Sequence, residues 1–190
     1  MSLVGFFSDP HFGHTNIIEY CQRPFASIEE MDEALIARYN EMVGPEDEVW
    51  WLGDCFFKWT NGRAEEVLGR MNGTKYLIRG NHDRRQTKTA LLRAGFASVA
   101  DQACIDLGGM PTLLCHYPYA SGTPDQRYLN LRPALLAGQF LLHGHAHSKP
   151  YQKLRIEPGL QLDCGVDAWG YGIAPIDDVL DFMKTWGGSL

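Results

Sequence analysis

The chain has 190 residues, of which 45% are hydrophobic and 21% are charged, and its formal net charge is −6 at pH 7. This length suits one domain with a substantial core and is short for a TIM barrel of about 250 residues, so we expect a single domain over residues 1–190. The negative net charge argues against binding of long nucleic acid. The sequence shows no long apolar run and no signal peptide, which predicts a cytoplasmic protein without a membrane segment.

The first elements alternate between strand and helix, and polar residues follow the strands. The apolar run 3–7 predicts a buried strand that stops before Pro10, so Asp9 and His11 project beyond its end. Ser27 and Glu30 form a capping box for a helix over residues 28–42. Further along the chain we predict buried strands over 49–52 and 76–78 and helices over 64–71 and 87–94.

The second half of the chain turns to shorter strands. We predict these strands over residues 98–107, 112–115, 140–142 and 160–166, followed by a helix that begins at Pro175. Two sheets packed face to face with outer helices accommodate this many strands, so the pattern predicts an α/β fold. The polar segment 117–130 is predicted to be a surface loop near the functional site.

Five short motifs supply oxygen and nitrogen groups that bind metal ions, and no single one of them is specific. They are Asp9-Pro-His11, Gly53-Asp54, Gly80-Asn81-His82-Asp83, His116 and Gly144-His145-Ala146-His147. Most of them follow predicted strands, and open α/β sheets place their ligands at the carboxyl ends of strands. Carboxylate, imidazole and amide ligands without thiolate suit Mn²⁺, Fe or Zn²⁺. The five scattered cysteines contain no C-x-x-C pair, so we predict neither a disulfide framework nor a thiolate zinc site.

The order of these motifs resembles the calcineurin-like metallophosphoesterase superfamily from Asp9 to His147, and residues 163–171 resemble the ending of small bacterial and phage members. The resemblance implies a four-layer αββα sandwich of mixed sheets and two divalent metal ions. It also implies the ligands: one ion is held by Asp9, His11 and His147, the other by Asn81, His116 and His145, and both by the bridging Asp54.

This resemblance implies a hydrolase that acts on phosphoric ester bonds. Two metal ions about 3.5–4 Å apart can activate a shared water for attack on phosphorus. His82 matches the family position that neutralises a phosphoryl oxygen or protonates the leaving group, so we predict that it is the catalytic histidine. The predicted substrate is a phosphomonoester or phosphodiester, either one of nucleotide type or another small phosphorylated molecule. Neither a membrane nor long nucleic acid is an expected partner.

Substrate contacts are less specific in the sequence. His14 and Asn16 either approach the phosphate or cap the short helix that follows them. Lys58 follows two phenylalanines in a loop and either contacts a nucleobase or covers the core, and Tyr117 is either a substrate contact or a packed ring. Arg23 and Arg127 are further alternatives of the same kind, each a substrate contact or a surface charge.

Two other functions compete with the phosphoesterase. An amidohydrolase-like zinc hydrolase also uses His-x-His ligands, but it requires a longer barrel with that motif near its start, whereas His145 and His147 come late in this chain. A non-catalytic metal-binding protein-interaction scaffold of the same fold would predict gaps in the motif set, and all five motifs are present.

Overall fold

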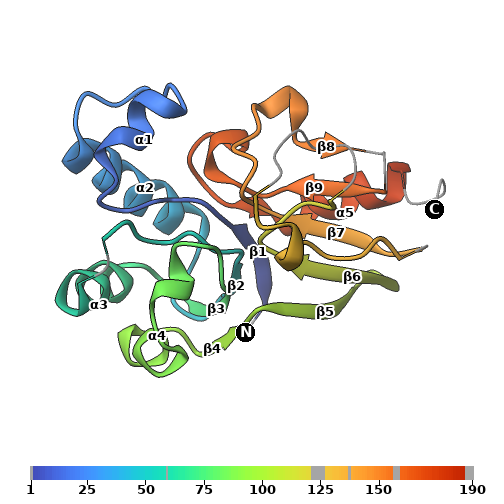
Figure 1. Ribbon diagram of the computed structural model, residues 1–190, viewed down its shortest axis with the longest axis horizontal. Helices are drawn as coiled ribbons and strands as arrows, with labels where there is room; N and C mark the ends of the chain where they lie inside the picture. The colour runs from blue at the N-terminus through green and yellow to red at the C-terminus, as the bar shows by residue number, and fades with distance from the viewer. Residues whose placement is uncertain (1, 59, 121–126, 137, 156–158, 187–190) are drawn as a thin grey trace.

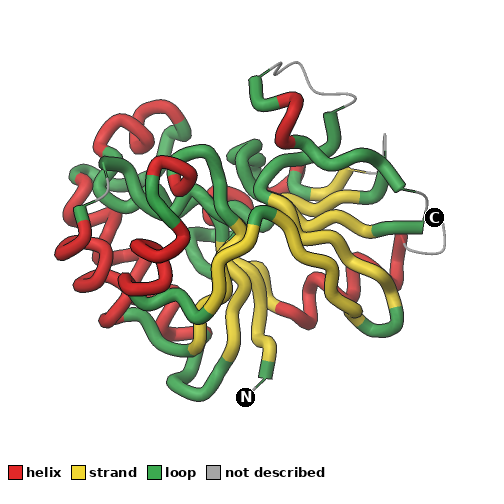
Figure 2. Tube along the Cα trace, turned by 60° about the horizontal axis from the view of Figure 1, so that its bottom comes forward, coloured by secondary structure: helices red, strands yellow, loops and turns green. Residues whose placement is uncertain are grey.

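The protein is built on two five-stranded β-sheets (Figures 1 and 2). The structure is a computed structural model, and it describes all residues except 1, 59, 121–126, 137, 156–158 and 187–190. The first sheet has the order β10-β1-β2-β3-β4, and the second has the order β5-β6-β7-β9-β8. Both sheets mix parallel and antiparallel neighbours, because β10 is antiparallel to β1 and both β5 and β8 are antiparallel to their partners.

The strand bounds are as follows. In the first sheet they are β1 Leu3–Phe7, β2 Glu48–Trp51, β3 Thr74–Ile78, β4 Ser98–Ala100 and β10 Ala174–Pro175. In the second sheet they are β5 Gln102–Leu107, β6 Met110–Cys115, β7 Phe140–His143, β8 Leu154–Arg155 and β9 Gln161–Asp163.

Helices flank the two sheets. In Figure 1, α1 to α4 lie beside the first sheet, and α5 runs beside the second sheet while also contacting β1 and β10 of the first. The helices are α1 Thr15–Tyr20, α2 Ile28–Met42, α3 Asn61–Arg70, α4 Lys88–Ala94 and α5 Ile176–Trp186. Short 3-10 turns are η1 Asp83–Arg85, η2 Leu129–Leu131, η3 Pro150–Gln152 and η4 Val166–Ala168. The predicted α/β fold of two mixed sheets with flanking helices is confirmed. None of the helices in the described ranges is long and apolar enough to cross a membrane.

Alternation along the strands divides the apolar side chains between separate cores. Phe7 and Trp51 pack with Met31 and Tyr39 of α2 on the helix-covered face of the first sheet. Their neighbours along the strands, Phe6 and Leu52, point to the other face and pack with Leu142, Leu162 and Val179. The second core therefore joins the two sheets, which keeps the edges where their strands end close together.

Several of the strand and helix boundaries predicted from the sequence are wrong, and the structure shows why. The strand predicted over 98–107 is divided at Asp101, which accepts hydrogen bonds from Arg79 while the chain passes from β4 in one sheet to β5 in the other. Residues 160–166 form a strand only over β9, after which the chain turns into η4. Pro175 does not start the last helix but pairs with Gly5 at the sheet edge, where a missing N–H is tolerated.

The long second helix begins as its sequence predicts. Ser27 Oγ accepts a hydrogen bond from the backbone N–H of Glu30 at 3.2 Å. The Glu30 carboxylate in turn accepts one from the backbone N–H of Ala26 at 2.7 Å. The first bond satisfies a donor that the helix start otherwise leaves open. The second reaches one residue before the N-cap, whereas a capping box would place it on Ser27.

Candidate metal centre

Residues of the five motifs meet where β1, β2, β3, β6 and β7 end. The parallel register of β1 and β2 pairs Phe7 with Trp51, so the loops after these strands run side by side. Backbone hydrogen bonds continue the pairing into the loops, from Asp9 N–H to Gly53 O at 3.0 Å and from His11 N–H to Asp54 O at 3.2 Å. Sheet register therefore brings the first two motifs together.

The backbone at the centre is strained. Five of the seven predicted metal ligands have a left-handed backbone, with φ of 56° at Asp9, 53° at His11, 51° at Asp54, 67° at His145 and 48° at His147. A non-glycine residue pays of order 1 kcal/mol or more for such a conformation. Strain of this kind clusters at functional sites, where it aims side chains that a relaxed loop would turn away.

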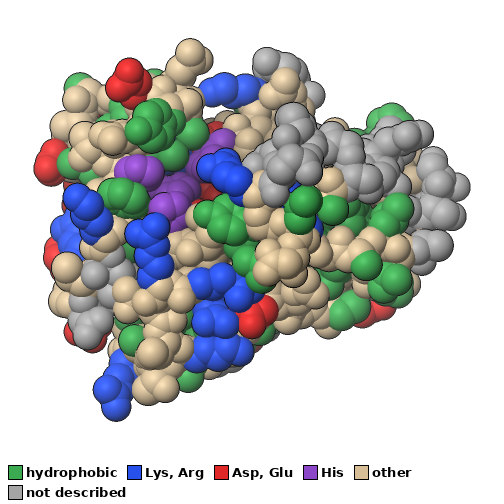
Figure 3. Space-filling model, viewed as in Figure 1, with side chains coloured by type: hydrophobic (Ala, Val, Ile, Leu, Met, Phe, Trp, Pro, Cys, Tyr) green, Lys and Arg blue, Asp and Glu red, His purple; other side chains and the backbone are tan. Residues whose placement is uncertain are grey.

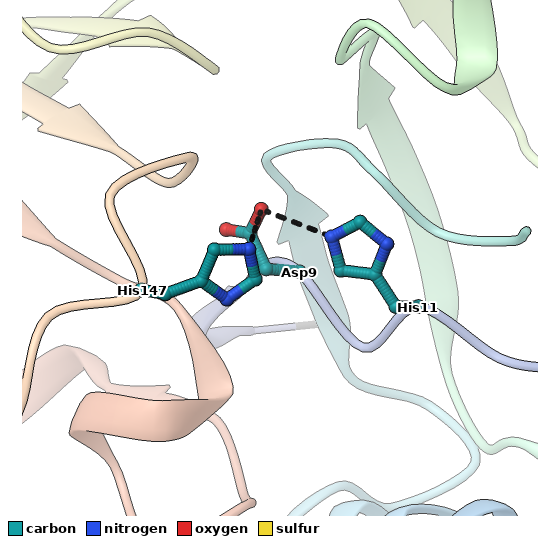
Figure 4. Close-up of side chains that lie close together, drawn as sticks. All are labelled: Asp9, His11 and His147. Carbon is teal, nitrogen blue, oxygen red and sulfur yellow. Dashed lines mark ion pairs between the residues drawn. The ribbon is translucent and has the colours of Figure 1, made fainter. Parts of the chain in front are cut away.

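One cluster is formed by Asp9, His11 and His147 (Figure 4). Asp9 Oδ1 lies 3.9 Å from His11 Nε2 and 4.0 Å from His147 Nε2. These separations are too long for hydrogen bonds. Two ligands that each lie about 2.0–2.2 Å from one ion are separated by roughly 3–4 Å, so the spacing fits a shared metal ion.

Asp54, His116 and His145 form a second cluster. Asp54 Oδ2 lies 3.5 Å from His116 Nε2 and 3.8 Å from His11 Nε2, which belongs to the first cluster. The carboxylate of Asp54 therefore lies between the two groups of candidate ligands.

Buried atoms without hydrogen-bond partners face this centre. Within the described part of the chain they include Asp9 Oδ1, His11 Nε2, Asn81 Oδ1 and His116 Nε2. The opposite ends of two of these side chains are anchored: Asp9 Oδ2 accepts from the backbone N–H of His145 at 2.9 Å, and His116 Nδ1 donates to Leu52 O at 2.7 Å. A buried polar atom without a partner is costly, and all four atoms are metal-ligand types. The residues present therefore fit divalent metal ions.

A buried charge network orients His147. Its Nδ1 donates to Asp167 Oδ2 at 2.8 Å, which leaves Nε2 to face Asp9. Arg23 donates to both oxygens of Asp167 at 2.9 and 2.8 Å and also to the carbonyl oxygens of Pro10 and Asp9. A carboxylate behind a histidine is the usual support of a metal-binding imidazole.

This network was not recognised from the sequence. The sequence predicts a substrate contact or a surface charge at Arg23, but its side chain is completely buried. Asp167 received no role, although it lies in the segment 163–171 that carries part of the family resemblance. The family resemblance of this segment is therefore the sequence signal that points to a role for Asp167.

Asp83 ties the second motif to the third. Its carboxylate accepts hydrogen bonds from the backbone N–H groups of Asp54 at 2.7 Å, Cys55 at 3.0 Å and Gly80 at 2.8 Å. Asp54 Oδ1 in turn accepts from the backbone N–H of His82 at 2.9 Å. These bonds hold the loops after β2 and β3 in one arrangement.

Two motif glycines are required by close approach. A Cβ atom on Gly144 would lie 2.2 Å from Asp9 Oδ2 and 2.0 Å from Ser8 Oγ. A Cβ atom on Gly80 would lie 2.1 Å from Asp54 Oδ1. Any larger residue at either position would push a carboxylate out of the centre.

Burial and charge set the protonation of the cluster. Burial lowers the pKa of His11 well below its usual value, which favours the neutral imidazole. Burial also acts to lower the pKa of His116, but the neighbouring Asp54 outweighs it and raises that pKa to about 9. Protonated His116 thus supplies positive charge beside Asp54 and Asp9, and a bound metal ion would replace that proton.

A cavity of 380 Å³ opens over the clusters. Its walls include His11, Asp54 and His145, and His82 also reaches it with a partly exposed side chain. Figure 3 shows histidine side chains gathered in a hollow of the surface, with lysine and arginine side chains around it. The candidate ligands are therefore accessible to a small molecule.

Two of the six candidate substrate contacts, His14 and Arg127, line this cavity. His14 lines it, makes no side-chain cap to α1 and stacks on Phe57 with ring centroids 3.9 Å apart. The residues that line the cavity do not include Asn16, Lys58 or Tyr117. Asn16 reaches the Tyr20 hydroxyl from within α1, and Lys58 is exposed in its loop.

Tyr117 is buried beneath the centre. Its ring packs against those of His116 and His145, at centroid distances of 4.8 and 5.1 Å. Tyr117 therefore supports two candidate ligands from below. The predicted loop 117–130 is described only in part, because residues 121–126 lie outside the described ranges.

The fold and this centre define an α/β protein that gathers aspartate and histidine clusters at the ends of its strands. The chain belongs to the calcineurin-like phosphoesterase superfamily, because the sequence model of that superfamily domain matches residues 2–162. The resemblance seen in the motifs is thereby confirmed.

Similar proteins come from phages, archaea and bacteria. The chain is 33% identical to the Gene 66 protein of Mycobacterium phage D29 over 97% of both chains. It is 34% identical to an uncharacterized protein of Methanocaldococcus jannaschii, over 78% of this chain and 71% of that protein. A crystal structure of a protein of unknown function from Aquifex aeolicus matches with a TM-score of 0.72 at 21% identity, covering 95% of this chain and 99% of that one. This last similarity shows the fold alone.

Proposed function

We infer that the protein is a two-metal phosphoesterase that hydrolyses a phosphomonoester or phosphodiester of a small molecule. The position of Asp54 carries this inference. Its Oδ2 atom lies 3.8 Å from His11 Nε2 and 3.5 Å from His116 Nε2, which belong to different clusters. One carboxylate between two sets of ligands is the arrangement that a pair of metal ions requires.

The proposed ligand sets follow from the two clusters. Asp9, His11 and His147 would hold one ion, Asn81, His116 and His145 the other, and Asp54 both. Two divalent ions bound there would supply positive charge for a phosphate and activate water for attack on phosphorus. The ligand types admit Mn²⁺, Fe or Zn²⁺.

His82 is the proposed catalytic histidine. Its ring lines the cavity and packs edge-on against His11 at a centroid distance of 5.0 Å. Its Nε2 lies 3.9 Å from Asp54 Oδ2, so a phosphate above the centre is within reach of the imidazole. From there His82 would donate a hydrogen bond to a phosphoryl oxygen or a proton to the leaving group.

Metal analysis and an ester panel test the proposed function. Protein purified without chelator should contain divalent metal, and added Mn²⁺ should stimulate hydrolysis of monoesters or diesters. Asp54→Asn should lower both metal content and hydrolysis, because a neutral amide with one oxygen replaces the carboxylate that both proposed sites share. Absence of bound metal together with absence of metal-stimulated hydrolysis would overturn the proposal, whereas bound metal without hydrolysis of any ester would favour a non-catalytic metal-binding scaffold.

A further inference from the structure

Two tyrosines with exposed rings line the cavity above the candidate metal centre. Tyr20 is the last residue of α1 and is 69% exposed, and Tyr128 precedes η2 and is 37% exposed. Neither was singled out in the sequence. Exposed aromatic rings at the mouth of a cavity are typical of binding surfaces, because each offers a large apolar face with a polar tip.

The two rings border different parts of the centre. Tyr20 stands edge-on to His14, with centroids 6.2 Å apart and an interplanar angle of 81°. His14 in turn lies 6.2 Å from the ring of His82. Tyr128 stands edge-on to His145 at 5.7 Å and 82°. A molecule bound above the clusters would therefore meet one tyrosine from α1 and one from the turn before η2.

The size and chemistry of the cavity indicate what this molecule is. A volume of 380 Å³ lies at the lower end of the range of about 300–1,000 Å³ for small-molecule sites. The floor carries histidines and Asp54, where the proposed metal ions would attract a phosphate, whereas the two tyrosines and Ile17 offer apolar surface. Planar rings bind well to such surfaces by stacking.

We propose that Tyr20 and Tyr128 determine specificity by holding a planar aromatic ring joined to the phosphate, so that the preferred substrates are aryl or nucleoside phosphates. This proposal rests on the proposed function of the same cavity. It adds to it the chemical class of the organic group and the residues that recognise it.

Paired substrates isolate the contribution of the ring. Turnover of adenosine 5′-monophosphate is compared with that of ribose 5-phosphate, which lacks the base. Turnover of benzyl phosphate is compared with that of methyl phosphate, because the two leaving alcohols have similar acidity and only one carries a ring. The wild type should have a higher kcat/KM for the ring-bearing member of at least the first pair. The second pair distinguishes a demand for any aromatic ring from a demand for a nucleobase.

Variants assign the preference to the two tyrosines. Tyr20→Ala and Tyr128→Ala should each lower kcat/KM for the ring-bearing esters by roughly 5- to 100-fold, and they should lower kcat/KM for ribose 5-phosphate by a smaller factor. Tyr20→Phe and Tyr128→Phe keep the ring and should retain the preference. Leu129→Ala is a matched control, since Leu129 is 44% exposed in the same turn and is not a wall of the cavity.

The outcomes separate this inference from the proposed function. Equal turnover of both members of each pair, or an equal loss for both in the alanine variants, would overturn the role of the tyrosines and leave the phosphoesterase in place. If the wild type hydrolyses no ester, the proposed function fails, and calorimetric titration still tests the rings. Tighter binding of adenosine 5′-monophosphate than of ribose 5-phosphate, lost in the alanine variants, would support their role, and equal binding would overturn it.

Discussion

Asp167→Asn should damage both the stability of the protein and its hold on metal. The substitution keeps the shape of the side chain and removes its charge. Arg23 and Asp167 have side chains that are 0% and 2% exposed, so the remaining guanidinium would be buried without its counter-ion. Breaking such a pair costs about 3–5 kcal/mol. We expect the lower value, about 3 kcal/mol, because the carbonyl oxygens of Pro10 and Asp9 still accept from Arg23.

The same substitution acts on His147 separately. The asparagine is a weaker acceptor for His147 Nδ1, which now donates to a carboxylate at 2.8 Å. Loss of such a partner behind a metal-binding histidine lowers metal affinity by about 10- to 100-fold. Because this effect requires metal and the loss of stability does not, the two can be measured apart.

Urea unfolding in the presence of chelator measures the first effect, and titration of the metal-free protein with Mn²⁺ or Zn²⁺ measures the second. Glu33→Gln is the matched control, since it breaks a two-point ion pair with Arg70 whose side chains are 59% and 40% exposed. The control should cost less than about 1 kcal/mol and leave metal affinity unchanged. If Asp167→Asn behaved like this control in both assays, the buried network would not support the centre.

Three further substitutions test other parts of the structure. His82→Ala should lower turnover by roughly 10²–10⁴-fold without changing metal content, and loss of metal would show that His82 is a ligand instead. Gly144→Ala should lower metal affinity by displacing the Asp9 carboxylate, whereas Gly69→Ala, whose Cβ would have no neighbour within 4 Å, should raise the free energy of unfolding by up to about 1 kcal/mol. Burial lowers the pKa of Lys75 from 10.5 to about 8, so the unfolded chain binds more protons between these pH values and the free energy of unfolding should rise across them. Lys75→Met should flatten this rise in urea titrations and stabilise the protein at pH 7 by up to roughly 3 kcal/mol, and an unchanged slope would contradict the pKa assignment.

Local signals predicted the elements that hold the centre. The apolar run of β1, the run that ends β2 and the N-cap of α2 are each complete within a few neighbouring residues. The motif residues could be found for the same reason, since each motif occupies at most four consecutive positions. Short-range patterns of this kind depend on period and turn chemistry, which a sequence displays directly.

The sequence did not predict strands that form only by pairing with distant segments of the chain. Strands β8 and β10 have two residues each and exist only through their antiparallel partners. The chain is likewise divided into β4 and β5 because β4 pairs within the first sheet and β5 pairs within the second. Nothing in the local sequence marks such positions, because the stabilising hydrogen bonds come from elsewhere in the chain.

The sequence by itself determined the superfamily, the mixed α/β fold and the set of candidate ligands. Each buried strand and each motif consists of a few consecutive residues, so its pattern can be recognised without the tertiary structure. Only the tertiary structure decided which residues support and surround those ligands. Arg23 and Asp167 are 144 positions apart and become partners only when the loop after α1 meets η4. Tyr20 and Tyr128 meet the same cavity for the same reason. Side-chain contacts of this range follow from how the sheets pack, and no local pattern in the chain encodes them.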